Sequence, residues 1–498
     1  MRVAADDANE ALISSNPRVF FIRDAVRTEL HFARFNLLSS SPFPGTMRLR
    51  ILLLAVLIAM PAFAGAQATR LRVPATVDTL PNGLILIVHE DHSVPRVATN
   101  IWYRVGSGDE KPGRTGFAHL FEHLMFMGSQ NAPYPTFDKL VEPFGMGANG
   151  STTEDRTDYI QDGAANALDV TMWLESDRMG WLLPTMDSAK VDAQRDIVKN
   201  ERRQSYENQP YGMAADILPP ALYPKGHPYS WPVIGSMADL SAASLEDVKE
   251  FFRKYYAPNN ASIVIAGDVN TDSVRRIVRK YFGDIPRGPA ITRTTPAPFT
   301  VRDTGIVAED RVQLPRLYLG WHTVNNTNKD AAPLDILSYL LSGARNSRLT
   351  NTLVYQREIA SSVSAFSDTK RLDGDYSIVA TARPGQGLDS LKVAIDRELL
   401  RLATEGPTAR ELEQAKNASE SSFLNEMEFI DAKAARLNEY AYFEGTPDYF
   451  QKDLDALRAV TAADIKRVIN AYLRGPRVML SIVPRGKLDL AAKRVIVQ

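Results

Sequence analysis

The chain has 498 residues and a hydrophobic content of 44%, which is enough to bury more than one core. Its formal net charge of -1 supplies no overall field that would favour nucleic acid or an anionic membrane surface as a partner. The absence of cysteine excludes disulfides, thiolate nucleophiles and cysteine zinc sites. Any metal ligands must therefore be His, Asp or Glu.

A strongly apolar segment begins at Met47 and has the three-part form of a secretory signal peptide. Arg48 and Arg50 come first, the apolar run 51–60 follows, and small residues come last. Cleavage after any of three alanines satisfies the small-x-small rule, namely Ala64, Ala66 or Ala68. We therefore expect a signal peptide, with a membrane anchor or a buried helix as the alternative.

These features predict a periplasmic or secreted protein without a stable membrane span once the signal at residues 47–68 is removed. Because a signal peptide should begin a chain, we expect translation to start at Met47, with an unusual extension before the signal as the alternative. Residues 1–46 are then interpreted as a non-native or mis-assigned extension.

The first expected domain, residues 69–286, mixes strands and helices. An Asn-Gly pair within residues 80–83 separates two alternating apolar runs, which is typical of a β-hairpin. The other patterns predict strands at 96–105 and 262–265, a loop at 106–116 that leads into an apolar helix, and helices at 136–144, 165–183, 188–207, 244–256 and 272–281.

Residues 286–300 are rich in Pro, Thr and Arg and show little periodicity, so we interpret residues 287–310 as a linker. The second expected domain, residues 311–498, repeats the coarse plan of the first but contains no second histidine pair and hence no metal site. Its patterns predict strands at 316–321 and 477–483, and helices at 332–341, at 388–405, from 409 onward and at 462–472.

Two histidines lie four residues apart in the apolar segment 116–125, with a glutamate directly before the second one. On a helix, His119 and His123 share one face, so their imidazoles can converge on one metal ion. Glu122 can reach a water at that metal without being a ligand, which is the role of a general base in the H-x-x-E-H order of inverzincins. The alternative is a pair of core histidines, but burying these groups without a metal would leave them expensively desolvated.

Catalytic zinc normally has three protein ligands and one open position, so a third His, Asp or Glu must come from elsewhere in the chain. The expected helix 188–207 carries Glu201 on its inward stripe, beside Val198. Glu207 lies near the end of that helix, and Glu154 lies in a polar loop. We therefore choose Glu201 as the third ligand.

Residues 116–129 resemble the zinc helix of the pitrilysin family, which includes insulysin and the mitochondrial processing peptidases. Residues 194–201 are similar to the helix that carries the family's third zinc ligand, and this match independently selects Glu201. The resemblance extends over about residues 75–485. It implies an α+β fold of two homologous domains, each a largely antiparallel β-sheet packed against α-helices, and one Zn²⁺ per chain.

Residues 149–159 resemble the active-site edge strand of the family. The resemblance implies that Asn149, Gly150 and Ser151 hold a peptide substrate by adding it to the sheet as an extra strand, a mode that reads backbone more than side chains. His227 belongs to a stretch that looks like the close of the first family domain, and we expect it to be structural.

Two departures from the family pattern matter. Many relatives have a glutamate seven residues before the third ligand that supports the site, but Gln194 stands there in this chain and adds no charge. The substrate-binding Arg and Tyr of the family are replaced by Val354 and Ser361. The resemblance therefore implies a zinc-bearing subunit that forms a heterodimer with a homologous non-zinc chain carrying the Arg/Tyr pair, with a homodimer as the alternative.

The sequence thus predicts a zinc-dependent metalloendopeptidase subunit that hydrolyses unfolded peptides or oligopeptides. One alternative is a non-catalytic peptide-binding or scaffold subunit of such a complex, because a fold can outlive its activity. Another is a metal-dependent hydrolase of a different bond, which the expected peptide-binding strand disfavours. No nucleic-acid partner is expected.

Overall fold

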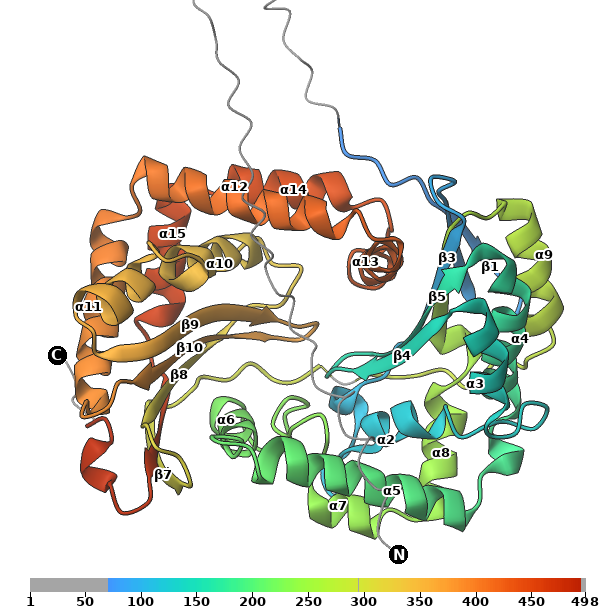
Figure 1. Ribbon diagram of the computed structural model, residues 1–498, viewed down its shortest axis with the longest axis horizontal. Coiled ribbons are helices and arrows are strands. Elements are labelled where there is room, and N and C mark those ends of the chain that lie inside the picture. Colours follow the sequence, from blue (N-terminus) through green and yellow to red (C-terminus); the bar gives the residue numbers. More distant parts are fainter. Residues whose placement is uncertain (1–69, 294, 494–498) are drawn as a thin grey trace, which may run out of the picture. The chain divides into compact units, whose positions relative to one another are not determined.

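The computed structural model describes residues 70–293 and 295–493 (Figure 1). The expected signal peptide at 47–68 and the segment 1–46 lie outside these residues. Two β-sheets are present, each packed against α-helices, and this confirms the α+β class predicted from the sequence. No helix in the part of the chain described is both long enough and apolar enough to cross a membrane.

The first sheet has six strands in the order β1-β2-β6-β3-β5-β4. In that order they are β1 (Thr76–Thr79), β2 (Ile85–Glu90), β6 (Ala261–Gly267), β3 (Arg96–Tyr103), β5 (Thr157–Ala164) and β4 (Gly147–Thr152). Strands β2 and β6 are parallel and the other neighbours are antiparallel. The predicted hairpin joins β1 to β2, and Gly83 in its turn has a φ of 95°. Strand β4 ends the sheet.

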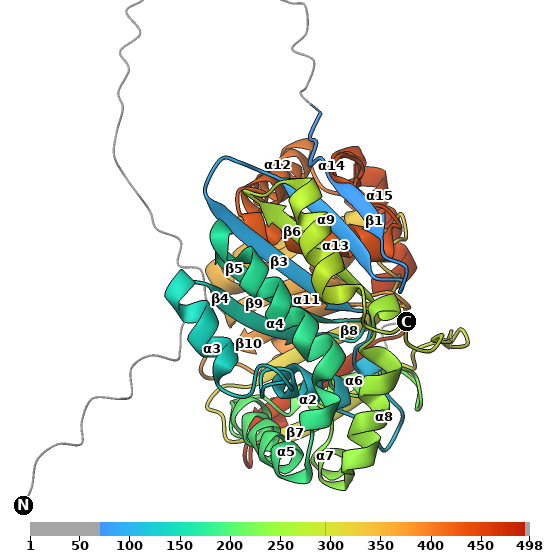
Figure 2. The same cartoon turned by 90° about the vertical axis from the view of Figure 1, so that its right-hand side faces the viewer.

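Helices of the first half pack on one side of this sheet, either against the sheet or against one another (Figure 2). They are α2 (Phe117–Leu124), α3 (Thr136–Val141), α4 (Leu168–Trp181), α5 (Ser188–Arg202), α7 (Met237–Ala242), α8 (Leu245–Tyr255) and α9 (Thr271–Phe282). Alternation along the strands directs Leu86, Val97 and Ile101 into the core beneath these helices. Ile87 and Ala98 point to the opposite face, which is also buried.

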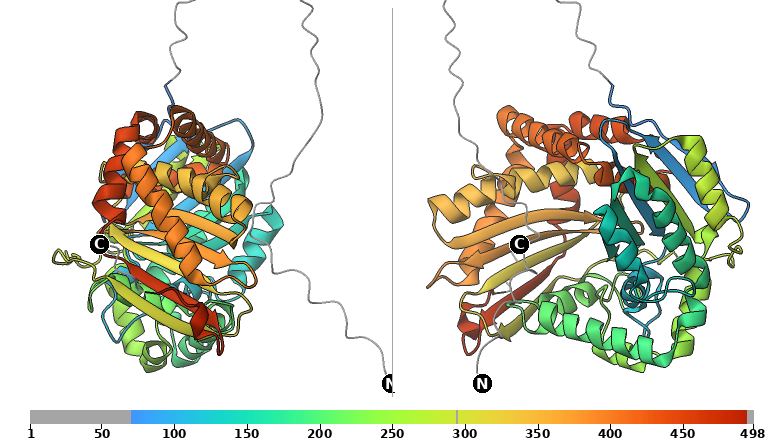
Figure 3. Two further views of the ribbon diagram at one scale, coloured as in Figure 1. Left: turned by 90° about the vertical axis from the view of Figure 1, so that its left-hand side faces the viewer. Right: turned by 45° about the vertical axis from the view of Figure 1, so that its right-hand side comes forward.

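The second sheet has five strands in the order β7-β11-β8-β10-β9 (Figures 1 and 3). They are β7 (Thr304–Asp310), β11 (Val478–Pro484), β8 (Arg316–Thr323), β10 (Gly374–Ala382) and β9 (Ala360–Thr369). The pair β7 and β11 is parallel and the others are antiparallel. The order and directions match those of β2-β6-β3-β5-β4, so the two halves share one topology.

Strand β7 occupies the end of the range 287–310 that the sequence predicted to be a linker. Its residues alternate between half-buried and exposed positions, and it pairs with β11 at the edge of the second sheet. A seven-residue strand beside Pro- and Thr-rich sequence carries a weak periodic signal, which is why the prediction extended the linker too far.

Each half also supplies a helix to the other half. Helix α13 (Ile430–Phe443), with α12 (Ala409–Glu426) and α14 (Phe450–Ala459), buries the second face of the first sheet. Helix α6 (Ala214–Leu222) packs in return against Val478, Leu480 and Ile482 of β11. The remaining face of the second sheet is covered by α10 (Ala331–Ser338), α11 (Leu388–Glu405) and α15 (Ala462–Val468).

Several elements differ from the sequence prediction. Strands β5, β9 and β10 and helix α6 were not predicted from periodicity; α6 contains Pro219 and Pro220, which normally argue against a helix. The predicted helix 188–207 is present as α5 followed by a π-helical turn, Arg203–Glu207.

Candidate metal centre

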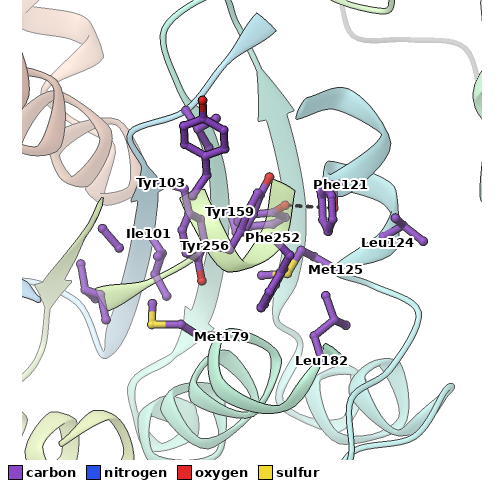
Figure 4. Packing of buried hydrophobic residues seen from close by; sticks show 14 of the residues in the cluster. Ile101, Tyr103, Phe121, Leu124, Met125, Tyr159, Met179, Leu182, Phe252 and Tyr256 are labelled. Atoms are coloured by element: carbon purple, nitrogen blue, oxygen red, sulfur yellow. Dashed lines mark hydrogen bonds between the residues drawn. The ribbon is translucent and has the colours of Figure 1, made fainter. Parts of the chain in front are cut away.

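Helix α2 carries the two histidines, and its opposite face is anchored in the core. Phe117, Leu120, Phe121 and Leu124 are almost completely buried. Behind the helix, Phe121 packs against Phe252 and Tyr256, and the Tyr159 hydroxyl donates a hydrogen bond to the Phe121 carbonyl oxygen (Figure 4). The apolar face of α2 therefore fixes the direction in which its polar face points.

The start of α2 is held by Gly116 and Glu110. Gly116 has a φ of 88°, and a β-carbon placed there would lie 2.6 Å from the Ile234 carbonyl oxygen, so only glycine is accommodated. The buried Glu110 carboxylate accepts hydrogen bonds from the backbone N–H groups of Gly116 (2.9 Å) and Ala118 (2.8 Å). Burial raises the pKa of Glu110 to about 8, and these backbone amides act against that rise.

Helix α5 brings Glu201 to the same place. Asp187 caps its N-terminus by accepting a hydrogen bond from the Lys190 backbone N–H at 2.8 Å. The next residue after Glu201, Arg202, is buried and donates from Nη2 to both carboxylate oxygens of Asp216 in α6, at 2.9 and 2.8 Å. The C-terminal end of α5 is thereby tied to the helix that packs on the second sheet.

The three side chains chosen from the sequence lie close together in the structure. Nε2 of His119 lies 3.6 Å from one carboxylate oxygen of Glu201, and Nε2 of His123 lies 3.3 Å from the other. The ligand atoms of all three residues lie within 4.8 Å of one another. Two ligands of a tetrahedral zinc ion, each about 2.0–2.1 Å from the metal, are separated by about 3.4 Å. The two separations from Glu201, 3.6 and 3.3 Å, are close to this value.

The pKa shifts of His119 and Glu201 also favour the protonation states that metal ligands need. Burial lowers the pKa of His119 to about 4, so its imidazole is neutral near pH 7, as a metal ligand must be. The hydrogen bond with His123 lowers the pKa of Glu201 and keeps its carboxylate ionised. Two histidines and one glutamate form a donor set typical of catalytic zinc.

Glu122 lies beside this cluster but is not one of its three ligands. The Thr152 hydroxyl of β4 donates a 2.7 Å hydrogen bond to Oε2 of Glu122. Burial raises the pKa of Glu122, while the hydrogen bond from Thr152 acts in the opposite direction. A buried carboxylate with a raised pKa is a candidate for a general base.

The expected substrate-binding residues lie on β4, at the free end of the first sheet. Strand β4 pairs with β5 on one side only among the residues described, so its other backbone edge is unpaired. Asn149 accepts a hydrogen bond from the Gly150 backbone N–H, and the Ser151 hydroxyl donates to Asp158. The strand therefore offers backbone groups to an added strand.

Gln194 lies two turns before Glu201 on α5 and is 5% exposed. Within the ranges described, its amide forms no hydrogen bond with His119 or His123. Nδ1 of His119 is buried and has no partner among these residues. The support that a neighbouring side chain usually gives to a metal-binding imidazole is thus not supplied by Gln194 in this arrangement.

Three other residues named in the sequence analysis lie elsewhere. His227 bonds through Nε2 to Asp373 of the second half at 3.0 Å, and so connects the two halves. Val354 packs against the core of the second half, and the Ser361 hydroxyl donates to the Thr381 carbonyl oxygen. Sequence reasoning missed Glu110 and Thr152, because neither has a motif that links it to α2.

Known families match most of the described chain. The profile of the family described as Insulinase (Peptidase family M16) matches residues 86–228, which include all three ligand candidates and Glu122. A second profile, described as Peptidase M16 inactive domain, matches residues 242–419.

Individual relatives align over nearly the same range. Zinc protease PqqE of Helicobacter pylori is 30% identical over 408 residues, which cover 80% of this chain and 89% of that protein. Mitochondrial-processing peptidase subunit beta of Blastocladiella emersonii is 24% identical over 416 residues, covering 81% and 87%.

Solved structures share the fold. A crystal structure of a protease from Helicobacter pylori has a TM-score of 0.76 and 27% identity, and the match covers 83% of this chain and 100% of that one. The periplasmic protease PqqL from Escherichia coli has a TM-score of 0.70 and 18% identity, and the match covers 86% of this chain and 50% of that one.

Proposed function

Because this chain belongs to the insulinase family of peptidases, family M16, we propose that it is a zinc-dependent endopeptidase subunit that hydrolyses unfolded peptides or oligopeptides. One observation carries the proposal. The ligand atoms of His119, His123 and Glu201 lie within 4.8 Å of one another, and Glu122 lies beside them with a raised pKa.

His119, His123 and Glu201 would hold one zinc ion. When bound, zinc supplies a Lewis acid that polarises the scissile carbonyl group and makes water more acidic. Glu122 takes the proton from the attacking water and then delivers it to the leaving amine. Its raised pKa favours both steps, since the carboxylate must accept and release a proton near neutral pH.

The substrate lies along the unpaired edge of β4 in this proposal. Asn149, Gly150 and Ser151 present backbone groups that bond to an extended peptide, so the strand holds many sequences and excludes folded proteins. Such binding orients the scissile bond towards α2, which packs against the same strand.

We further propose that the active form is a heterodimer. Val354 and Ser361 stand where relatives carry the substrate-binding Arg and Tyr, and a homologous chain without a metal site would supply that pair. PqqL, of which this chain matches 50%, and the mitochondrial subunit beta support a paired arrangement. A homodimer is the alternative. The expected signal peptide and the periplasmic location stated for PqqL favour a periplasmic or secreted enzyme.

The test uses the tagged chain purified from its native cell, together with every chain that co-purifies. Wild-type complex should contain one zinc per tagged chain and cleave an unstructured fluorogenic peptide, and a chelator should abolish cleavage. Glu122→Gln should keep the zinc and lose turnover by at least about 100-fold, whereas His123→Ala should lose both. Glu246→Gln is the matched control, because its side chain is 74% exposed.

Two outcomes would contradict the proposal. Wild-type cleavage by the Glu122→Gln complex at equal zinc content would remove Glu122 from the mechanism. A complex that contains no zinc and shows no chelator-sensitive cleavage would instead favour the scaffold alternative.

A further inference from the structure

We propose that Thr152 is a positioning residue that holds the general base from the peptide-binding strand, so that occupation of β4 sets the orientation of Glu122. This inference rests on the proposed function, since it assigns Glu122 as the base and β4 as the peptide-binding edge. It adds a residue to the site and a way for the substrate to regulate it.

The contact between the two residues is direct. Oγ1 of Thr152 lies 2.7 Å from Oε2 of Glu122, a normal length for a hydroxyl bonded to a carboxylate. Among the residues described, Thr152 is the only side-chain donor that bonds to this carboxylate. The other oxygen, Oε1, has no hydrogen-bond donor within residues 70–293 and 295–493, and it remains available to a water molecule.

The main chain of β4 fixes Thr152 from the other side. In the register of the sheet, Thr152 is paired with Thr157 of β5, which is buried and bonds through its hydroxyl to the Val105 carbonyl oxygen. The position of the Thr152 hydroxyl is therefore set by the sheet and not by α2. Glu122 is thus held between its own helix and a neighbouring strand.

Gly150 provides a second, independent indication that β4 packs closely against the Glu122 side chain. A β-carbon built on Gly150 would lie 2.9 Å from Cγ of Glu122 and 3.4 Å from the Phe126 ring. Residues 150 and 152 lie on the same face of a strand, whereas 149 and 151 face the other way. The face of β4 directed at α2 is therefore shaped by the Glu122 side chain.

The free edge of β4 makes this arrangement responsive to the substrate. Gly147, Ala148 and Asn149 are exposed, while residues 150–152 are half-buried. A peptide that pairs with the open edge adds hydrogen bonds to the strand that carries Thr152, and so restricts the motion of its hydroxyl. The base would then be oriented most firmly when a substrate is present.

The experiment compares Thr152→Val, which replaces the hydroxyl with a methyl group, with Thr152→Ser, which keeps it. In the native complex, Thr152→Val should lower kcat about ten- to a hundredfold, the effect of losing one hydrogen bond to a charged group. KM, zinc content and thermal midpoint should stay near wild type, and Thr152→Ser should recover most of kcat. Thr99→Val is the matched control, since it removes a buried hydroxyl from β3 of the same sheet.

A double-mutant cycle tests whether Thr152 acts through Glu122. The shorter side chain of Glu122→Asp does not reach the hydroxyl, so adding Thr152→Val to it should cause no further loss of its residual kcat. An additive loss in the double variant would overturn the inference, as would a Thr152→Val complex with the wild-type kcat. A wild-type complex without chelator-sensitive cleavage would overturn the proposed function and this inference together.

Discussion

Gln194 carries no charge at a position where many relatives have a glutamate, and this is a testable property of a single side chain. Its position on α5 is buried, two turns before Glu201. In Gln194→Glu, an added carboxylate would strengthen the electrostatic field at the histidines, so we expect zinc to bind up to about tenfold more tightly. Competition with a metal chelator measures the dissociation constant. Gln130→Glu adds the same charge at an exposed position and should leave that constant unchanged.

The sequence singled out residues that are close neighbours in the chain. It missed residues whose partners come from distant segments. His119, Glu122 and His123 are neighbours on one helix, so their spacing alone predicts that they share a face. Glu201 was selected by periodicity and by resemblance, and the structure brings its carboxylate to the histidines. Their role in holding zinc stays a prediction. Thr152 bonds to Glu122, which lies 30 positions away in the sequence, and no local sequence pattern predicts such a contact.

Helix α2 has only eight residues, so its stability depends on groups outside it. Glu110→Ala would remove the acceptor of two backbone N–H groups at its first turn, and we expect a loss of about 1–2 kcal/mol in unfolding free energy. Because the two histidines follow in the same helix, zinc affinity should fall as well. Urea denaturation and chelator competition measure the two effects.

The conservative variant separates these effects from a general loss of folding. Glu110→Gln keeps one carboxamide oxygen as an acceptor, so both quantities should lie between those of wild type and Glu110→Ala. Equal zinc affinity in all three proteins would show that the hydrogen bonds accepted by Glu110 do not position the histidines.

Elements with strong periodicity were predicted well, and elements defined by their environment were not. The range 388–405 was predicted as a helix and is helix α11, because an amphipathic run is bounded there by glycines at both ends. Helix α6 contains Pro219 and Pro220 and was missed, since it is stabilised by packing against β11. Strands β9 and β10 are rich in Ser, Thr and Ala, so their apolar alternation is weak.

At the scale of the whole molecule, the two halves share a buried polar contact. The Asn438 amide of α13 donates to the backbone and side-chain oxygens of Asn100 in β3, and its own oxygen accepts from Ser262 in β6. Asn438→Ala would remove these three buried hydrogen bonds, each of which typically contributes about 0.5–1.5 kcal/mol. We expect unfolding free energy to fall by about 2–4 kcal/mol, with both halves still unfolding in one transition.

Urea denaturation followed by tryptophan fluorescence measures this effect. Asn425→Ala, at an exposed position of α12, is the matched control and should have no effect beyond a few tenths of a kcal/mol. Two separate transitions in the wild-type protein would contradict the expected cooperativity between the halves.

Helices α6 and α13 are exchanged between the two halves, as in a domain swap within one chain. This exchange lowers the contribution that the connecting segment must make to holding the halves together. Each sheet receives one covering helix from the opposite part of the chain, so the parts stay interlocked through apolar surface and through Asn438, whatever joins them covalently. We therefore expect a single cut near Pro289 to leave a nicked molecule that still migrates as one particle, because these contacts between the halves do not depend on the peptide bond that is cut.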